Sequence, residues 1–269
     1  LENVRKNAKR KNADCAITTE GISECFIPYI DMFDQRAGNM EYFGHFHEGI
    51  PCGPETIPIF SYVYGQYIAA YCAAYPECNR PETVYWTRCI GKSLCQKVIP
   101  TTGKYFPQPD KINPNIIEFY KKIAFITKRF WKYIVFGRII KPPDIDAPKI
   151  IAYYGKMVLT EKRHFMDMKE KRKVKDLAIQ HSTFKAEDGS VAHFFVNISE
   201  KKVKFTARFR ETEKGSIFIE KYADGILVEK GFYKKSPSNK QLSIDGLSTI
   251  IFIFKNKRKN ESKRKVCKV

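Results

Sequence analysis

The sequence lacks any apolar run long enough to cross a membrane. Its most apolar long segment, residues 113–136, still carries five Lys or Arg residues. A transmembrane helix needs about 20 consecutive apolar residues, so we expect no membrane span and a soluble protein. The basic residues 1–14 are not followed by an apolar stretch, so we also expect no signal peptide. The chain begins with Leu1 rather than Met, which predicts that it is part of a larger product.

Several motifs of well-known chemistry are also missing. The sequence has no GxSxG, P-loop or GxGxxG pattern, which argues against acyl transfer and nucleotide-dependent chemistry. Its eight cysteines form neither a CxxC pair nor a Cys/His cluster with zinc-finger spacing. Most of them lie among apolar residues, as free cysteines do, which favours an intracellular or reduced setting. We therefore expect neither a metal nor a cofactor.

Acidic residues are scarce, with 29 Asp and Glu against 48 Lys and Arg and a net charge of +19. The excess is concentrated in three stretches, residues 1–11, 161–175 and 255–269, and the rest of the chain is close to balance. Basic runs attract polyanions without specificity. No zinc-finger, basic-zipper or aromatic RNA-binding pattern accompanies them, so we expect no specific nucleic-acid partner.

With 43% hydrophobic residues, the chain can form a sizeable core. The first half mixes helical and strand-like segments, which fits the units of an α/β barrel or layered fold. Asn113 and Pro114 predict the start of an amphipathic helix that runs to about residue 136, ahead of Gly137. The other expected elements are a helix at 3–12, strands at 15–19 and 57–64, and a helix at 66–75.

The second half has the pattern of short strands separated by turns. Strands of this length at about ten-residue spacing favour an antiparallel β-sandwich. We expect an α/β unit at 1–150, a basic connector and sandwich entry at 151–176, the sandwich at 177–255 and a disordered basic tail at 256–269. The expected strands are 177–184, 191–198, 202–209, 216–222, 225–232 and 247–254.

Three acids follow the first predicted strand within twelve residues. Glu20 lies at the end of that strand, Gly21 allows a sharp turn, and Glu24 and Asp31 come next. In barrels, catalytic side chains project from the carboxyl ends of the strands. Glycosidic cleavage requires two carboxyl groups, one protonated and one ionised. The alternative is that Glu20 only caps the next helix, since acids favour first turns.

A second cluster combines aromatic and imidazole side chains. His45 and His47 in a His-x-His pattern would share one face of a strand, but no further metal ligands accompany them. Aromatic side chains stack well on sugar rings. Tyr42, Tyr64 and Trp86 are therefore candidate sugar contacts, together with His45, although most aromatic residues in such runs belong to the core.

Several short motifs together resemble a known group of proteins. These motifs follow one another along the chain in the order that they have in that group. They are the segment 16–24 with Asp31, the segment 57–64, the helix ending at 137–143, and the segments 184–189 and 193–197. They resemble a poorly characterised group of glycoside-hydrolase-like proteins, known mainly as a domain of unknown function and broadly akin to α-galactosidase and amylase barrels.

The resemblance implies the C-terminal portion of a TIM-type (β/α) barrel, with about its last three strand units, followed by the sandwich. It also implies a hydrolase of O-glycosidic bonds with a carbohydrate substrate, in which Glu20 is the nucleophile or acid/base. Glu24 and Asp31 would orient the substrate or tune the pKa of Glu20. Two alternatives remain open: a non-catalytic carbohydrate-binding or structural remnant, and a basic nucleic-acid-associated protein.

Overall fold

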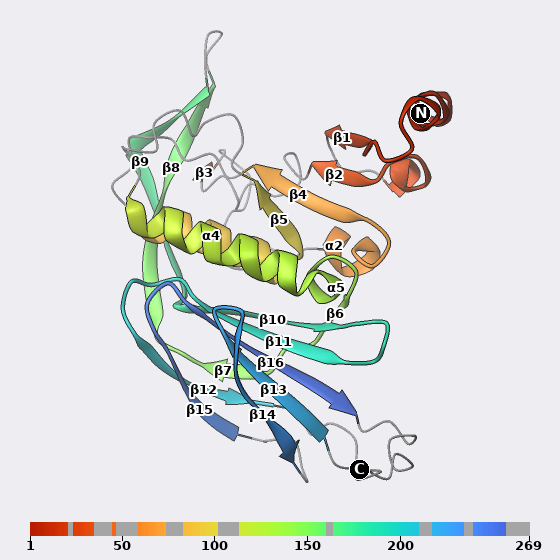
Figure 1. Ribbon diagram of the computed structural model, residues 1–269. Helices are drawn as coiled ribbons and strands as arrows, with labels where there is room; N and C mark the ends of the chain where they lie inside the picture. Colours follow the sequence, from red (N-terminus) through yellow and green to blue (C-terminus); the bar gives the residue numbers. More distant parts are fainter. Residues whose placement is uncertain are drawn as a thin grey trace, which may run out of the picture.

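The computed structural model describes residues 1–20, 24–34, 45–46, 59–73, 83–101, 113–159, 164–209, 217–233 and 239–256. The fold is mixed α/β and contains several antiparallel sheets (Figure 1). A parallel sheet with helices forms near the N-terminus, and the second half of the chain forms the antiparallel sheets. No helix in the described ranges has the length and apolar character needed to cross a membrane.

Four short strands form the parallel sheet in the order β1-β2-β4-β5. A 3-10 helix connects β1 to β2, and helices lie in the next two connections, as is usual between parallel strands. Within the described ranges the sheet ends at four strands, so no barrel closes. The elements are α1 (Glu2–Lys11), β1 (Thr18–Glu20), η1 (Glu24–Tyr29), β2 (Met32–Asp34), α2 (Ile59–Tyr64), β4 (Ala69–Ala73), α3 (Thr83–Cys95) and β5 (Val98–Thr101).

Two of the predicted elements in this part are wrong. Residues 59–64, expected to be a strand, form α2, because Phe60 and Tyr64 lie four residues apart and one turn of helix brings both onto the core around Phe33. The expected helix at 66–75 contains strand β4, whose Ala70 is buried between the neighbouring strands β2 and β5. Tertiary pairing overrides the helix preference of alanine here.

Two antiparallel sheets pack face to face in the second half of the chain, and we call them the double sheet. One sheet has six strands in the order β14-β13-β16-β11-β10-β6, and the other has three in the order β15-β12-β7. Phe195, Phe205 and Phe252 belong to the core between the two sheets. The strands are β6 (Arg138–Ile140), β7 (Asp144–Asp146), β10 (Ile179–Lys185), β11 (Val191–Asn197), β12 (Val203–Arg208), β13 (Ile217–Ala223), β14 (Ile226–Tyr233), β15 (Asn239–Ile244) and β16 (Thr249–Asn256).

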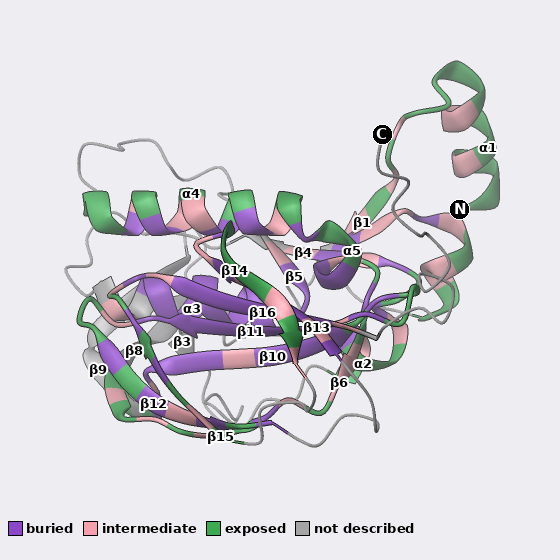
Figure 2. Ribbon diagram, turned by 60° about the horizontal axis from the view of Figure 1, so that its bottom comes forward, coloured by how far each residue is buried: buried purple, intermediate pink, exposed green. Residues whose placement is uncertain are grey.

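Helices cover the other face of the six-stranded sheet. Helix α4 (Pro114–Arg129), the short α5 (Trp131–Ile134) and α3 bury Phe119, Tyr133 and Trp86 against Phe194 of this sheet. The inner strands β10, β11 and β16 of the six-stranded sheet, unlike its largely exposed edge strand β14, are therefore buried on both faces, as their long buried stretches in Figure 2 illustrate. Strands with this environment read as near-continuous apolar runs in the sequence.

The predicted start of helix α4 is confirmed. The side chain of Asn113 accepts a hydrogen bond from the backbone N–H of Asn115 at 3.0 Å, and Pro114 occupies the first helical position. The helix does not run unbroken to residue 136, because it ends at Arg129 and α5 begins at Trp131. Phe130 between them is buried against Phe194 and Tyr222.

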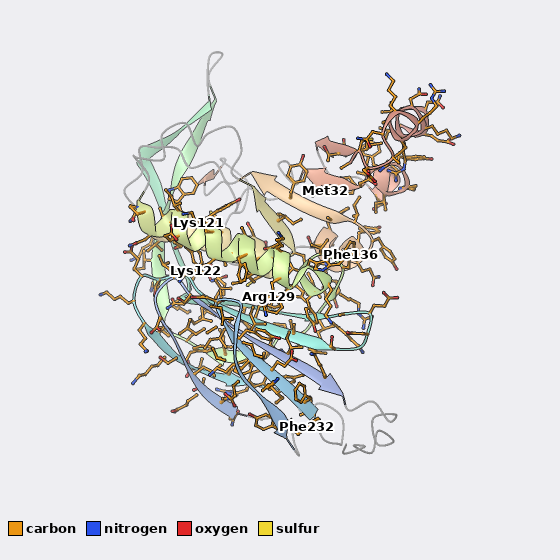
Figure 3. All side chains as sticks on the ribbon, viewed as in Figure 1. Met32, Lys121, Lys122, Arg129, Phe136 and Phe232 are labelled. Carbon is orange, nitrogen blue, oxygen red and sulfur yellow. The ribbon has the colours of Figure 1, made fainter. Side chains whose placement is uncertain are left out.

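Charged side chains fix α4 on the turn between β13 and β14. Lys122 forms an ion pair with Asp224 at 3.0 Å, and the guanidinium of Arg129 lies 5.7 Å from the ring centroid of Tyr222. Figure 3 shows both basic residues along α4. Gly225 has a positive φ of 81°, and a Cβ atom there would lie 2.8 Å from the ring of Phe125 on α4. The turn therefore requires glycine both for its backbone conformation and for its close approach to the helix.

The segment expected to be a basic connector contains a long β-hairpin. Strand β8 (Lys149–Leu159) pairs with β9 (His164–Leu177), with an irregularity in the register between Gly155 and Lys156. The short strand β3 (His45–Phe46) pairs with β8 in parallel. The hairpin thus joins a segment near the N-terminus to the entry of the double sheet.

Candidate active site

The four strands of the parallel sheet all end at one edge, which we call the carboxyl edge. Their last residues are Glu20, Asp34, Ala73 and Thr101. Glu20 is paired in register with Asp34, and Asp34 with Tyr71. In parallel α/β sheets, ligands bind at this edge because the strand-to-helix loops gather there. Two acids therefore occupy paired positions where such folds place their chemistry.

Alternate residues of these strands form an apolar row. Phe33, Ala70 and Val98 are paired in register and are no more than 4% exposed. The ring of Phe33 packs edge-on against Phe60 of α2, with 5.0 Å between the ring centroids. Successive strand residues face opposite sides of a sheet. The next register row along these strands contains the backbone positions of Glu20, Asp34 and Tyr71, and Phe33 packs the middle of β2 into the apolar row.

The structure brings Glu24 and Tyr64 together. The hydroxyl of Tyr64 donates a hydrogen bond to Glu24 Oε2 at 3.2 Å, and the negative charge of Glu24 raises the pKa of Tyr64. The ring of Tyr64 lies 5.1 Å from Phe60, so this pair is on the helix side of the sheet. Tyr64 precedes β4 instead of following a strand. Tyr64 is therefore at the end of a helix and not in the strand that was expected at 57–64.

Asp31 lies at the opposite, amino edge of the sheet. Its carboxylate accepts hydrogen bonds from Arg5 at 3.0 Å and from the Ile17 N–H at 2.9 Å, and Lys9 Nζ lies 3.4 Å away. Burial raises the pKa of Asp31, but the Ile17 hydrogen bond and the two cations outweigh it and hold the pKa below its usual value. In this structure the carboxylate ties α1 to the start of the sheet.

The remaining predicted contacts are dispersed. Trp86 is 4% exposed and lies in the core between α3 and the double sheet, where its ring packs against protein side chains. His45 belongs to β3 and is paired with Gly155 of β8. Tyr42 lies outside the described residues. Of the predicted site residues, Glu20 is the one at the carboxyl edge of a described strand.

Sequence reasoning missed Asp34 and Tyr71. The signal for Asp34 was a short apolar segment, Met32 and Phe33, that ends in an acid, just as β1 ends in Glu20. Tyr71 could not be found in this way, because residues 66–75 have the composition of a helix. The described residues contain no group of three His, Cys, Asp or Glu side chains that could hold a metal ion.

Comparisons with known proteins give one family match and several distant structural matches. Residues 1–75 match the family described as "Domain of unknown function (DUF6259)", and this segment contains β1, β2 and β4. No curated protein matches the chain.

Three solved structures illustrate the structural matches. A GH30 endoxylanase from Clostridium papyrosolvens C71 has 8% sequence identity and a TM-score of 0.38, over 93% of this chain and 58% of that one. An arabinofuranosidase has 10% identity and a TM-score of 0.40, over 94% and 60%. The α-galactosidase I from Mortierella vinacea has 8% identity and a TM-score of 0.36, over 84% and 53%. The chain thus spans less than two thirds of the length of each of these chains.

Proposed function

We propose that this chain is a carbohydrate-active, glycoside-hydrolase-like protein that cleaves O-glycosidic bonds with Glu20 and Asp34 as its paired carboxylates. One observation carries this proposal: the two acids occupy paired positions at the carboxyl ends of adjacent parallel strands. Asp34 is the proposed partner of Glu20, and we no longer assign Asp31 to the site, because Asp31 precedes β2 and already binds Arg5. Glu24 keeps its proposed role of orienting the substrate or tuning the pKa of Glu20.

The spacing of the strands favours a retaining reaction. Adjacent strands lie about 4.8 Å apart. Retaining glycosidases hold their two carboxyl groups about 5–5.5 Å apart, and inverting enzymes need about 6.5–9.5 Å to admit a water molecule. In the retaining route one carboxylate attacks the anomeric carbon and the other protonates the departing oxygen, then activates water. Where two carboxyl groups share a site, the charge of one raises the pKa of the other, and this reaction needs one carboxyl group to be protonated.

We propose a TIM-type barrel as the context of this site. The parallel pairing of all four strands and the helical connections between them support such an arrangement, in which the chain contributes part of the barrel. The double sheet would then be the β-sandwich domain that follows it. The proposed division keeps an α/β unit at 1–150 and a sandwich at 177–255, with the hairpin of β8 and β9 between them.

Turnover of a panel of nitrophenyl glycosides, covering pentoses and hexoses in both anomers, tests the proposal. Glu20→Gln and Asp34→Asn should each lower kcat/KM by about 10³-fold or more, because each removes a group that acts in the transition state. Asp31→Asn is the matched control at the amino edge and should change turnover by no more than a few-fold. Circular dichroism of each variant shows whether the fold is kept.

Two results would overturn the proposal. Near-normal turnover in folded Glu20→Gln would remove Glu20 from the chemistry. Binding of glycans without cleavage of any glycoside, with Glu20→Gln binding as the wild type does, would instead indicate a non-catalytic carbohydrate-binding protein. Azide added to the less active variant gives a glycosyl azide whose anomeric configuration identifies the nucleophile.

A further inference from the structure

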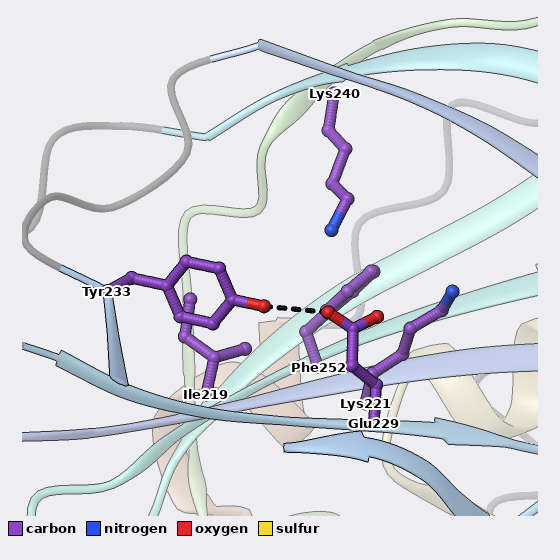
Figure 4. Close-up of a pocket in the computed structure, with 6 residues that line it drawn as sticks. All are labelled: Ile219, Lys221, Glu229, Tyr233, Lys240 and Phe252. Carbon is purple, nitrogen blue, oxygen red and sulfur yellow. Dashed lines mark hydrogen bonds between the residues drawn. The ribbon is translucent and has the colours of Figure 1, made fainter. Parts of the chain in front are cut away.

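A small hollow opens at one end of the double sheet, far along the chain from Glu20. It has a volume of about 30 Å³ and lies between β13, β14 and β16 of the six-stranded sheet and β15 of the other sheet. Six side chains line it, and Figure 4 shows them: Ile219, Lys221, Glu229, Tyr233, Lys240 and Phe252.

The floor of the hollow is apolar and well buried. Ile219 is 5% exposed and Phe252 is 2% exposed. Glu229, Lys221 and Phe252 occupy one row across three neighbouring strands, because Lys221 is in register with both of the others. Glu229 and Lys221 are therefore in the same row as the ring of Phe252, which belongs to the core between the two sheets.

Two ammonium groups at the hollow form no close ion pair with any residue that the structure describes. Lys221 and Lys240 are half-buried, and neither forms an ion pair or a hydrogen bond within the described part of the chain. The ammonium of Lys240 reaches from β15 over the ring of Phe252, 5.0 Å from its centroid. Other lysines of the double sheet have carboxylate partners, such as Lys255 with Glu220 at 2.7 Å and Lys202 with Asp245 at 3.0 Å. Two half-buried cations that share one nearby carboxylate, Glu229, leave attractive charge for a ligand.

The single acid of the hollow is already held by a neighbour. Tyr233 donates a hydrogen bond to Glu229 Oε1 at 2.7 Å. This bond, and more weakly the charges of Lys240 and Lys221, keep the pKa of Glu229 below its usual value, so the carboxylate is ionised near neutral pH. Two lysines and one glutamate leave one net positive charge, which suits a monoanion better than a phosphate dianion.

We propose that this hollow binds the carboxylate group of a small ligand. A hollow of about 30 Å³ accommodates roughly two water-sized atoms, as the two oxygens of a carboxylate require. Lys240 and Lys221 donate charge-assisted hydrogen bonds to those oxygens, and the apolar part of the ligand rests against the Phe252 and Ile219 floor. Two sources share this chemistry, an acidic sugar and a simple organic acid. The site does not depend on hydrolysis at Glu20.

NMR titration of the isotope-labelled full chain tests the site, with the amide signals of Tyr233 and Lys240 as reporters. The probes are acetate, a methyl glucuronide, the neutral methyl glucoside and inorganic phosphate. Both carboxylates should shift these signals, and the glucoside should not. Lys240→Gln and Lys221→Gln should each weaken carboxylate binding about tenfold or more, since each removes a charged donor. A glucuronide that binds more tightly than acetate identifies the sugar as the source, and equal affinities identify the simple acid.

Lys230→Gln is the matched control, because Lys230 of β14 is in register with Glu220 in the row next to that of Lys221. It makes the same change of charge and should alter affinity by less than about twofold. Three results would overturn the inference. They are an unchanged carboxylate affinity in Lys240→Gln, a loss of affinity in Lys230→Gln as large as that in Lys240→Gln, and tighter binding of phosphate than of acetate. Hydrolysis by Lys240→Gln should match the wild type, so failure here and failure of the proposed function are separable.

Discussion

The parallel sheet and the double sheet differ in how much core supports them. The six-stranded sheet has strands of seven or eight residues at its centre and a core on each face. Strands β1 and β2 have three residues each, and the described core beside them contains Ile30, Phe33 and Ile68. The candidate active site is thus on the less supported part. Elements that bind ligands and move are drawn from the less stable parts of proteins, so this distribution is physically reasonable.

Equivalent truncations in the two cores test this difference directly. Phe195 and Phe33 both have 0% exposure, but Phe195 contacts the rings of Phe205, Phe209 and Phe252. Phe195→Ala should lower the free energy of unfolding by about 4–5 kcal/mol, because the cavity is enclosed by two rigid sheets. Phe33→Ala should cost about 3 kcal/mol, because its smaller surroundings can collapse. Denaturant unfolding measures both values, and a larger cost for Phe33→Ala would reverse the comparison.

A buried ion pair connects helix α3 to the end of strand β9, directly before β10 of the double sheet. Arg88 of α3 donates to Asp176 of β9 at 2.7 Å, Lys92 lies 3.6 Å from the same carboxylate, and the side chains of Arg88 and Asp176 are 0% and 9% exposed. Asp176→Asn should destabilise the protein by about 3 kcal/mol, because it removes a buried negative charge beside two buried cations.

The exposed pair of Asp245 and Lys202 is the control for that substitution. Asp245→Asn should cost less than about 1 kcal/mol, since solvent screens that pair. Comparable costs for Asp176→Asn and Asp245→Asn in denaturant unfolding would show that the buried pair does not link the two parts.

The double sheet should also respond to acid through His193. This imidazole is 7% exposed, Nδ1 bonds the hydroxyl of Thr183 at 2.8 Å, and burial lowers its pKa to about 3. The unfolded chain takes up a proton near pH 6.5 and the folded protein does not. Stability is therefore full above about pH 6.5 and falls toward pH 3, with a slope of up to about 1.4 kcal/mol per pH unit.

Few carboxylates titrate between pH 7 and pH 5, but burial also lowers the pKa of His181, so the difference between the wild type and His193→Phe over this range measures the contribution of His193. His193→Phe removes the titrating group while keeping a ring of similar shape, so its stability should change much less over this range. Parallel pH profiles for the wild type and His193→Phe would contradict the assignment.

The smallest effect is expected at the N-terminal helix. Arg5 and Asp31 are each about one-third exposed, so Asp31→Asn should cost less than about 1 kcal/mol of global stability. The same substitution should nevertheless speed hydrogen exchange in α1, which buries none of its own residues. Because the partners of Asp31 hold its pKa below 3.8, this tie persists above that pH and is lost as the pH falls through the lowered pKa. Unchanged exchange in α1 would show that Asp31 does not hold the helix.

Some elements could be predicted because their signals are local. The amphipathic pattern and Asn113 fixed the start of α4, and the β-branched and aromatic runs at 191–198 and 247–254 became β11 and β16. Strand β15 was not predicted, because only two of its residues, Leu242 and Ile244, are buried and apolar, which is too short a pattern to indicate a strand. Helix α2 and strand β4 were predicted the wrong way round. The β-branched and aromatic composition of α2 favours a strand, and the alanines of β4 favour a helix.

The active-site prediction divides in the same way. The position of Glu20 at the end of a strand could be predicted from the sequence, because an acid directly after a short β-prone run is a local pattern, and its catalytic role stays a prediction. Asp34 required the pairing of β1 with β2, and the separation of Asp31 from Glu20 required knowing that β2 begins after Asp31. The surroundings of Asn197 also depend on the tertiary structure. Asn197 is part of an Asn-x-Ser sequence, but it is 0% exposed, and its side-chain amide donates hydrogen bonds to the carbonyls of Lys201, Ile244 and Asp245.

The sequence by itself determined the division into a mixed α/β first part and a second part rich in short antiparallel strands, because periodicity and turn residues act within a few positions of the chain. Only the tertiary structure decided which acid is in register with Glu20, at which edge of the sheet each predicted site residue lies, and that Lys240 and Lys221 line the same hollow. These are contacts between residues distant in sequence, and the free energy that selects them comes from burial and strand pairing across the whole fold.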